Sequence, residues 1–126
     1  MNDTQTDLQG DLLVILRHGP HGSSLLREGL DMALVAAAFG RRVSLLFMGT
    51  GCTALVSGQG QGPLGQKGTQ ATLNMLEMYD IETLLVESEA MHALGLEACD
   101  LSLPVIEVSP AQIQAAMTTH RLVATF

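Results

Sequence analysis

The chain has 126 residues and a formal net charge of −7, with 6 Lys and Arg residues against 13 Asp and Glu residues. This length fits one domain, and the acidic balance lacks the basic surface that a protein needs to bind nucleic acid by itself. Charged residues make up 15 % and hydrophobic residues 47 % of the chain, so apolar surface should remain after folding. We therefore expect an oligomer with no direct nucleic-acid binding.

Residues 1–11 are polar and acidic, and they lack the cationic start and apolar stretch of a signal peptide. We expect them to form a flexible N-terminal tail before a single domain over 12–126. No apolar run reaches the roughly 18 to 20 residues that cross a bilayer, which predicts no membrane contact. Two cysteines, Cys52 and Cys99, imply no disulfide framework, and the reducing cytoplasm is the expected location.

The first half of the domain alternates strand and helix patterns. Residues 12–16 form an apolar run typical of a strand that is covered on both faces. Ser23 or Ser24 is expected to cap a helix that ends at Gly40, and its apolar positions recur at helical spacing. These positions are Leu26, Leu30, Ala33, Leu34 and Ala37. A second apolar run at 43–48 completes a β-α-β unit, which predicts a parallel sheet.

The second half repeats this alternation after a glycine-rich segment. Residues 57–68 contain five glycines and one proline, which predicts a mobile surface loop. Ser109 and Pro110 form a helix start signal, with Ser109 as the cap. The remaining elements that the pattern predicts are a helical turn at 53–56, helices at 69–79, 87–94 and 111–118, and strands at 81–86, 105–108 and 122–126.

Reactive side chains are few at the expected carboxyl ends of the strands, where parallel sheets bind ligands. His18 and His21 follow the first strand, and Cys52 follows the second. An imidazolium beside a thiol lowers its pKa and makes it a nucleophile, so these three residues are the candidates for catalysis. The favoured interpretation is passive, because no acidic residue in that loop is placed to orient an imidazole. Cys99 has no histidine beside it and is also expected to be passive.

No cofactor or metal site is predicted. The sequence contains neither a Cys-x-x-Cys nor a His-Glu-x-x-His pattern, and the glycine-rich segment lacks the spacing of a phosphate-binding loop. Ser23 and Ser24 could hold a phosphate at a helix N-terminus, but helix capping is the favoured role. Met32, Met75 and Met78 lie at helical positions, where we expect them to fill gaps in the core.

Several short motifs occur in an order and spacing that resemble one protein family. They are Pro20-His21-Gly22, Arg27-Glu28-Gly29-Leu30-Asp31, Gly58-Gln59, Tyr79-Asp80-Ile81-Glu82, Gly95-Leu96 and the terminal Phe126. In this order they resemble the TusC/DsrF branch of the DsrE-like sulfur-relay family, over nearly the whole chain from Leu12. The resemblance implies a three-layer α/β/α fold with a five-stranded parallel sheet.

The resemblance also implies a heterohexamer with two copies each of three related subunits. This chain would be one of the three, and its partners would be a TusB-like chain and a cysteine-bearing TusD-like chain. In that family sulfur moves as a cysteine persulfide toward 2-thiolation of the tRNA wobble uridine, or in dissimilatory sulfur oxidation. The acceptor cysteine of the larger relay subunit lies at the end of the third strand. Residues 83–87 hold no thiol here, so no catalytic residue is carried over to this chain.

The favoured function is that of a structural subunit in tRNA thiolation, and three alternatives remain open. One is a DsrF-like subunit of a sulfur-oxidation complex, which the sequence separates poorly from the first. Another is a small thiol enzyme or persulfide carrier that uses Cys52 with His18 or His21. The last is a ligand-binding module in which the segment 57–68 acts as a lid.

Overall fold

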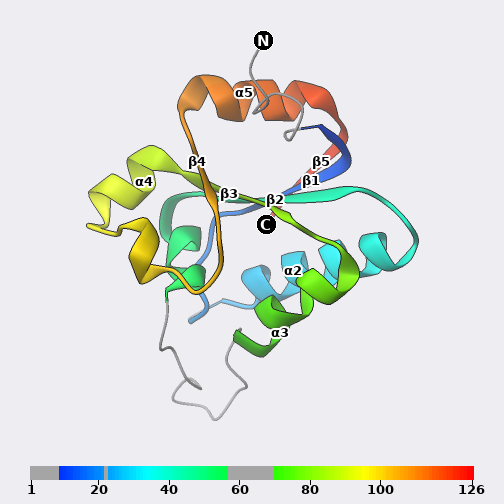
Figure 1. The fold of residues 1–126 in the computed structure, drawn as a ribbon, viewed down its shortest axis with the longest axis horizontal. Helices are drawn as coiled ribbons and strands as arrows, with labels where there is room; N and C mark the ends of the chain where they lie inside the picture. The colour runs from blue at the N-terminus through cyan, green and yellow to red at the C-terminus, as the bar shows by residue number, and fades with distance from the viewer. Residues whose placement is uncertain (1–8, 22, 57–69) are drawn as a thin grey trace.

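The computed structural model describes residues 9–21, 23–56 and 70–126, which form one five-stranded sheet (Figure 1). The strands are β1 (Gly10–Leu16), β2 (Val43–Phe47), β3 (Thr83–Glu87), β4 (Ile106–Val108) and β5 (His120–Thr125). Their order is β4-β3-β2-β1-β5, and all four pairs are parallel. The predicted parallel sheet is confirmed.

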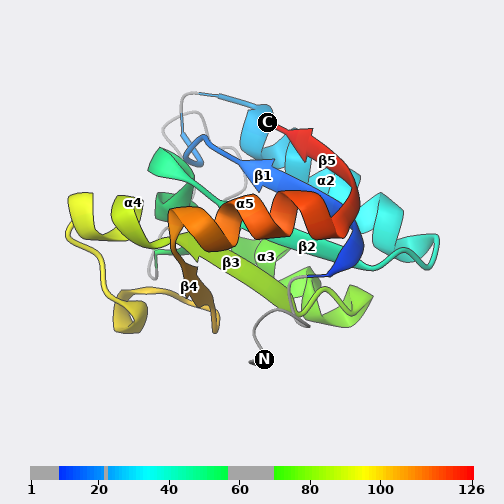
Figure 2. The same cartoon turned by 90° about the horizontal axis from the view of Figure 1, so that it is seen from above.

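Helices cover both faces of this sheet. The α-helices are α2 (Leu25–Ala38), α3 (Gln70–Met75), α4 (Ser88–Ala93) and α5 (Pro110–Thr119). The 3₁₀ helices are η1 (Gly49–Leu55), η2 (Glu77–Tyr79) and η3 (Ala98–Asp100). Figure 1 shows α2 and α3 below the sheet and α5 above it, and Figure 2 shows α5 crossing the strands from β4 toward β5. The three-layer α/β/α architecture predicted from the sequence is therefore confirmed.

The core divides into two clusters because successive strand residues point to opposite faces. On the α2 face, Leu12, Val14 and Leu16 of β1 belong to the same cluster as Leu26 and Leu30 of α2. On the α5 face, the cluster consists of Leu13, Ile15, Leu46, Leu85, Val108, Ile113 and Ala116. Each fully buried leucine contributes about 1.5–3 kcal/mol, so the two clusters hold the helices to the sheet.

The end of α2 lies where the sequence predicts it. Gly40 adopts a φ of 85°, which favours glycine, and its N–H donates to the carbonyl of Ala37 at 2.9 Å. The N–H of Arg41 donates to the carbonyl of Ala36 at 3.1 Å. These two bonds make the Schellman arrangement that satisfies carbonyls at a helix end, and they turn the chain into β2.

The predicted cap of the last helix is confirmed, whereas the first helix begins differently. Ser109 accepts a hydrogen bond from the N–H of Gln112 at 3.3 Å, and the Gln112 side chain accepts from the N–H of Ser109 at 2.8 Å. Ser24 caps no backbone N–H, because its hydroxyl donates to Glu28 at 2.9 Å. Ser23 instead accepts from the N–H of Leu25 at 3.1 Å.

Several element boundaries differ from those predicted. The first strand begins at Gly10, two residues before the run expected over 12–16, because Gly10 pairs with His120 and the N–H groups of Asp11 and Leu12 both donate to the Arg42 carbonyl. β3 begins at Thr83, not at residue 81. The 3₁₀ helix η1 begins at Gly49 and is longer than the turn expected over 53–56.

The helix expected over 69–79 is divided into α3 and η2. The N–H of Leu76 donates to the carbonyl of Leu73, and the N–H of Tyr79 donates to the carbonyl of Leu76. These bonds to the third residue back tighten the chain into a 3₁₀ turn. Asp80 then adopts a φ of 62°, which ends the helical segment before β3. The segment 57–68 predicted as a loop lies outside the described residues.

The prediction that Met32, Met75 and Met78 fill the core is wrong, since all three side chains are exposed. Helical spacing places a residue on a helix face without saying which face is buried. On α2 the buried stripe consists of Leu26, Gly29, Leu30 and Ala33, and Met32 belongs to a second apolar stripe. No helix among the described residues is long and apolar enough to cross a membrane.

Candidate functional site

The carboxyl ends of β1, β2 and β3 are joined by hydrogen bonds at one edge of the sheet. The N–H of Met48 donates to the carbonyl of Leu16 at 2.9 Å, and the hydroxyl of Thr50 donates to the carbonyl of Arg17 at 3.1 Å. The N–H of Gly49 donates to the Glu87 carboxylate at 2.9 Å. The 3₁₀ helix η1 thus links the loops after three neighbouring strands, as expected for this edge.

Gly51 lets η1 approach β1 closely. A Cβ atom at this position would overlap the carbonyl oxygen of Leu16. A Cβ atom at Gly19 would lie 2.8 Å from the hydroxyl oxygen of Thr53, so the loop after β1 also packs tightly against η1. These contacts leave little space between the loop that carries His18 and the 3₁₀ helix that carries Cys52.

Cys52 is fully buried beneath this edge. Its thiol donates to the carbonyl of Phe47 at 3.3 Å. Burial raises the pKa of the Cys52 thiol to about 11, and the negative charge of Glu87 adds to this, against hydrogen bonds from the backbone N–H groups of Glu87 and Cys52. Cys52 is therefore protonated at neutral pH, and a protonated thiol is a poor nucleophile.

The two histidines of the loop do not hydrogen-bond to this thiol. His18 is half-buried, and its Nδ1 atom is buried without a hydrogen-bond partner. His21 is exposed. The structure thus brings His18 and Cys52 to the same edge of the sheet but does not join a thiol to an imidazole. Cys99 is exposed in η3, which precedes β4, and its thiol lies 3.7 Å from a carboxylate oxygen of Glu97.

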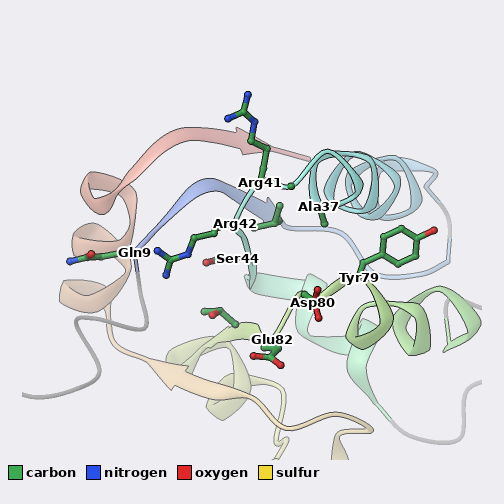
Figure 3. A pocket seen from close by; sticks show the side chains of 11 residues that line it. Gln9, Ala37, Arg41, Arg42, Ser44, Tyr79, Asp80 and Glu82 are labelled. Carbon is green, nitrogen blue, oxygen red and sulfur yellow. The ribbon is translucent and has the colours of Figure 1, made fainter.

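A hollow of about 300 Å³ lies at the opposite edge of the sheet, where β2 and β3 begin (Figure 3). It brings together cationic Arg42 and the carboxylates of Asp80 and Glu82. Figure 3 shows Arg42 extended toward Ser44 and Arg41 directed away from the hollow. Sequence reasoning missed this hollow, because its residues come from two turns that are far apart in the chain.

Ser44 in this hollow is hydrogen-bonded to the buried side chain of His120. The distance from the Ser44 hydroxyl oxygen to Nε2 is 2.8 Å, and Nδ1 lies 2.7 Å from the carbonyl of Ala116. A carbonyl can only accept, so Nδ1 carries the proton and Nε2 accepts from Ser44. The serine–histidine pair has the hydrogen bonds of a nucleophile and its base. Both side chains are buried and their hydrogen bond connects β2 to β5 across β1, so the pair stabilises the fold.

The His120 imidazole is held in its neutral form. Burial lowers its pKa from the ordinary value of 6.5, and the positive charge of Arg42 lowers it further. The hydrogen bond to the Ala116 carbonyl and the negative charge of Asp11 act in the opposite direction. Among the described residues, no group of three or more His, Cys, Asp or Glu side chains is arranged to hold a metal ion.

Comparison with known proteins identifies the fold family. The profile of the DsrE/DsrF-like family matches residues 11–122. The chain belongs to the DsrE/DsrF-like family. The resemblance inferred from the short motifs is confirmed.

Relatives of this DsrE/DsrF-like chain include several proteins named TusC homologue. The one from Pseudomonas aeruginosa is 37 % identical over 94 residues, which cover 75 % of this chain and 79 % of the relative. The one from Vibrio parahaemolyticus is 33 % identical over 103 residues, covering 82 % and 87 %. The crystal structure of the ychN protein from E. coli superposes with a TM-score of 0.77 at 19 % identity, covering 92 % and 98 %, which shows a shared fold.

In this DsrE/DsrF-like chain, Glu87 occupies the end of the third strand. The register pairs Val86 with Phe47 on β2 and with Glu107 on β4, and Glu87 with Val108, so this position lies where three strands end. Its carboxylate is engaged by the N–H of Gly49. From the sequence, Glu87 was expected to end the thiol-free segment 83–87 and to begin the helix over 87–94, with no role of its own. Its bond to Gly49 had no local signal, because 38 residues separate the partners.

Proposed function

We propose that this chain is a non-catalytic structural subunit of a heterohexameric sulfur relay that supplies persulfide sulfur for 2-thiolation of the tRNA wobble uridine. The observation that carries the proposal is the chemistry at the end of β3. The motif resemblance puts the relay cysteine of the larger subunit at this position, and this chain holds a hydrogen-bonded carboxylate, Glu87. A carboxylate cannot form a persulfide, because that bond requires a thiolate sulfur.

The state of Cys52 supports the same proposal. The alternative function, a small thiol enzyme or persulfide carrier, needs an accessible thiolate near neutral pH. Cys52 is buried, hydrogen-bonded to a backbone carbonyl and raised in pKa to about 11. Sulfur would therefore be carried by a cysteine of a TusD-like partner, with a TusB-like chain as the third subunit.

The names of the relatives favour the tRNA pathway over a DsrF-like role in sulfur oxidation, since the two relatives compared above are both named TusC homologue. We place this relay in the cytoplasm, where the two cysteines would remain reduced. The acidic net charge of −7 agrees with tRNA contact through a partner.

Co-expression with a TusB-like and a cysteine-bearing TusD-like partner chain, followed by size-exclusion chromatography with light scattering, tests the assembly. We expect one stable complex with two copies of each chain.

Deletion of the gene is expected to abolish 2-thiouridine in tRNA, measured by mass spectrometry of digested nucleosides. A chain that stays monomeric beside both partners contradicts the subunit proposal, and unchanged thiolation contradicts the pathway.

A further inference from the structure

The two edges of the sheet are protected very differently. Edge strand β4 has three residues with Glu107 at its centre, and Pro104 and Pro110 lie on either side of it. Short length, charge and nearby prolines are the usual means by which proteins prevent another strand from pairing with an edge. Edge strand β5 has six residues and carries none of these features except Arg121. The β5 edge is thus open to a further strand.

The backbone of β5 presents a regular row of free groups on this edge. The N–H of Phe126 donates to the carbonyl of Ile15, and its carbonyl accepts from the N–H of Arg17, so both groups point toward β1. Backbone groups alternate in direction along a strand. The N–H and carbonyl groups of Arg121, Val123 and Thr125 therefore point away from β1, and β1 is the one strand that pairs with β5 in the described sheet.

Apolar side chains flank this open edge on both faces of the sheet. Leu122, on the α2 face, is 68 % exposed, and Val123, on the α5 face, is 42 % exposed. On α2 itself, Val35 and Phe39 are also exposed, Phe39 to 80 %. A groove of about 290 Å³ between α2 and β5 connects Met32, Ala36 and Leu122. We call these residues the α2–β5 face. Exposed apolar side chains that gather beside an unpaired strand edge are typical of an interaction site.

The charges around this face select the kind of partner. Arg41 and Arg121 both line the groove, and no ion pair between described residues involves either guanidinium group. Asp11 lines the same groove, but its carboxylate accepts from the backbone N–H of Arg42 at 2.8 Å. A second copy of the chain would bring the same two arginines against themselves, and like charges in contact destabilise an interface. Carboxylates of a different chain would complement them.

We propose that a strand of a different, acidic partner chain pairs with the open edge of β5 and that its carboxylates face Arg41 and Arg121. The proposal rests on the proposed function for the partner's identity, which is one of the two related subunits. Beyond the proposed function, this inference specifies which surface of the chain binds the partner, that binding occurs by strand pairing, and that the partner is acidic. Strand pairing satisfies the free backbone groups, and the apolar side chains of the α2–β5 face become buried.

Charge reversal tests this surface in the co-expressed complex. Arg41→Glu combined with Arg121→Glu should weaken retention of the partner at least about tenfold, because attraction becomes repulsion. Arg27→Glu, at an exposed position in the first turn of α2, reverses a single charge away from the groove and should leave assembly unchanged. Phe39→Ser tests the apolar part of the same surface. Met78→Ser is its matched control, since both side chains are 80 % exposed.

Hydrogen exchange measured by NMR distinguishes strand pairing from a looser contact. The amides of Val123 and Thr125 should exchange much more slowly in the complex than in the free chain, whereas Ala124, whose N–H points toward β1, should change little. The free chain should be a monomer in light scattering. A dimer of the free chain that Leu122→Lys separates would identify a second copy as the occupant and overturn the proposal.

The outcomes separate the two proposals. If the wild-type chain fails to assemble with either partner, the proposed function fails and this inference fails with it. If the complex forms but both reversals and Phe39→Ser leave it intact, the proposed function stands and the α2–β5 inference is overturned. Assembly that depends on Arg41, Arg121 and Phe39, with slow exchange at Val123, supports both.

Discussion

The carboxylate of Glu87, at the end of β3, accepts a hydrogen bond of 2.9 Å from the backbone N–H of Gly49, at the start of η1. Gly49 adopts a φ of 54°, a backbone conformation that favours glycine. The bond therefore connects β3 to the turn after β2 at the edge where the loops of parallel strands meet. The Glu87 side chain, at the end of β3, thus connects the end of β3 to the end of β2.

Removing this carboxylate should destabilise the chain without unfolding it. Glu87→Ala leaves the N–H of Gly49 without its partner, at a cost of about 1 kcal/mol, since the bond is exposed to water. For a chain of this size, that corresponds to a decrease of roughly 3–5 °C in the midpoint of thermal unfolding measured by circular dichroism. Glu87→Gln keeps an accepting oxygen, so its unfolding midpoint should decrease less than that of Glu87→Ala. Equal midpoints for Glu87→Ala and the wild type would show that the bond contributes nothing.

Thiol labelling should separate the two cysteines. With a pKa of about 11, the Cys52 thiol has about one thiolate per 10⁴ molecules at pH 7, and it is also inaccessible. Cys99 is exposed and should react with iodoacetamide within minutes, whereas Cys52 should react only after denaturation. Peptide mapping by mass spectrometry measures both sites, and Cys99→Ser provides the control. Rapid labelling of Cys52 in the native chain would revive a persulfide-carrier function.

The fold followed from the sequence because its signals are local. Apolar runs such as 12–16, the turn at Gly40 and the cap at Ser109 each lie within a few residues, and the β-α-β order then sets the parallel sheet. The methionines were assigned to the wrong environment, because α2 carries two apolar stripes and spacing alone does not say which one faces the sheet. A stripe left exposed is information about assembly that the periodicity of one helix cannot provide.

The candidate site was predicted in its location but not in its contacts. Parallel topology brings the loop with His18 and the segment with Cys52 to one edge, and the structure has them there. The distances that decide reactivity depend on partners remote in sequence, such as Glu87 with Gly49 and Ser44 with His120, which are 38 and 76 residues apart. Local patterns carry no information about such pairs.

The stability of the chain should decrease in mild acid because of His120. Its folded-state pKa is lowered from the ordinary value of 6.5, so below pH 6.5 the unfolded chain binds more protons than the folded chain. The contribution of the neutral imidazole is therefore complete above about pH 6.5 and is lost as the pH falls below this value. Urea denaturation at pH 7.5, 6.5 and 5.5, pH values spanning roughly the titration range of histidine, measures the loss.

A substitution isolates this contribution from that of the other histidines. His120→Asn removes the titratable group, so it should be less stable at pH 7.5 but should lose less free energy of unfolding on acidification than the wild type. His92→Asn, at an exposed position in α4, is the matched control and should keep the wild-type pH dependence. If His120→Asn shows the full acid sensitivity, another group is responsible for it.

Two neighbouring glycines should respond differently to substitution with alanine. At Gly49 a Cβ atom would meet nothing within 4 Å, so the cost of Gly49→Ala comes from its positive φ, about 1–2 kcal/mol. At Gly51 a Cβ atom would overlap the backbone carbonyl of Leu16 at the carboxyl end of β1. Backbone cannot rotate away as a side chain can, so η1 must shift, and we expect a loss of about 3 kcal/mol or more.

Denaturation midpoints of the two variants, compared with the wild type, measure this difference. Where Gly51→Ala still folds, the displaced η1 should loosen the packing over Cys52, because Gly51 and Cys52 are adjacent in that helix. Faster labelling of Cys52 in Gly51→Ala than in Gly49→Ala is therefore the second expected result. Equal stability and equal labelling of the two variants would mean that the close approach of η1 to β1 is not what keeps the thiol buried.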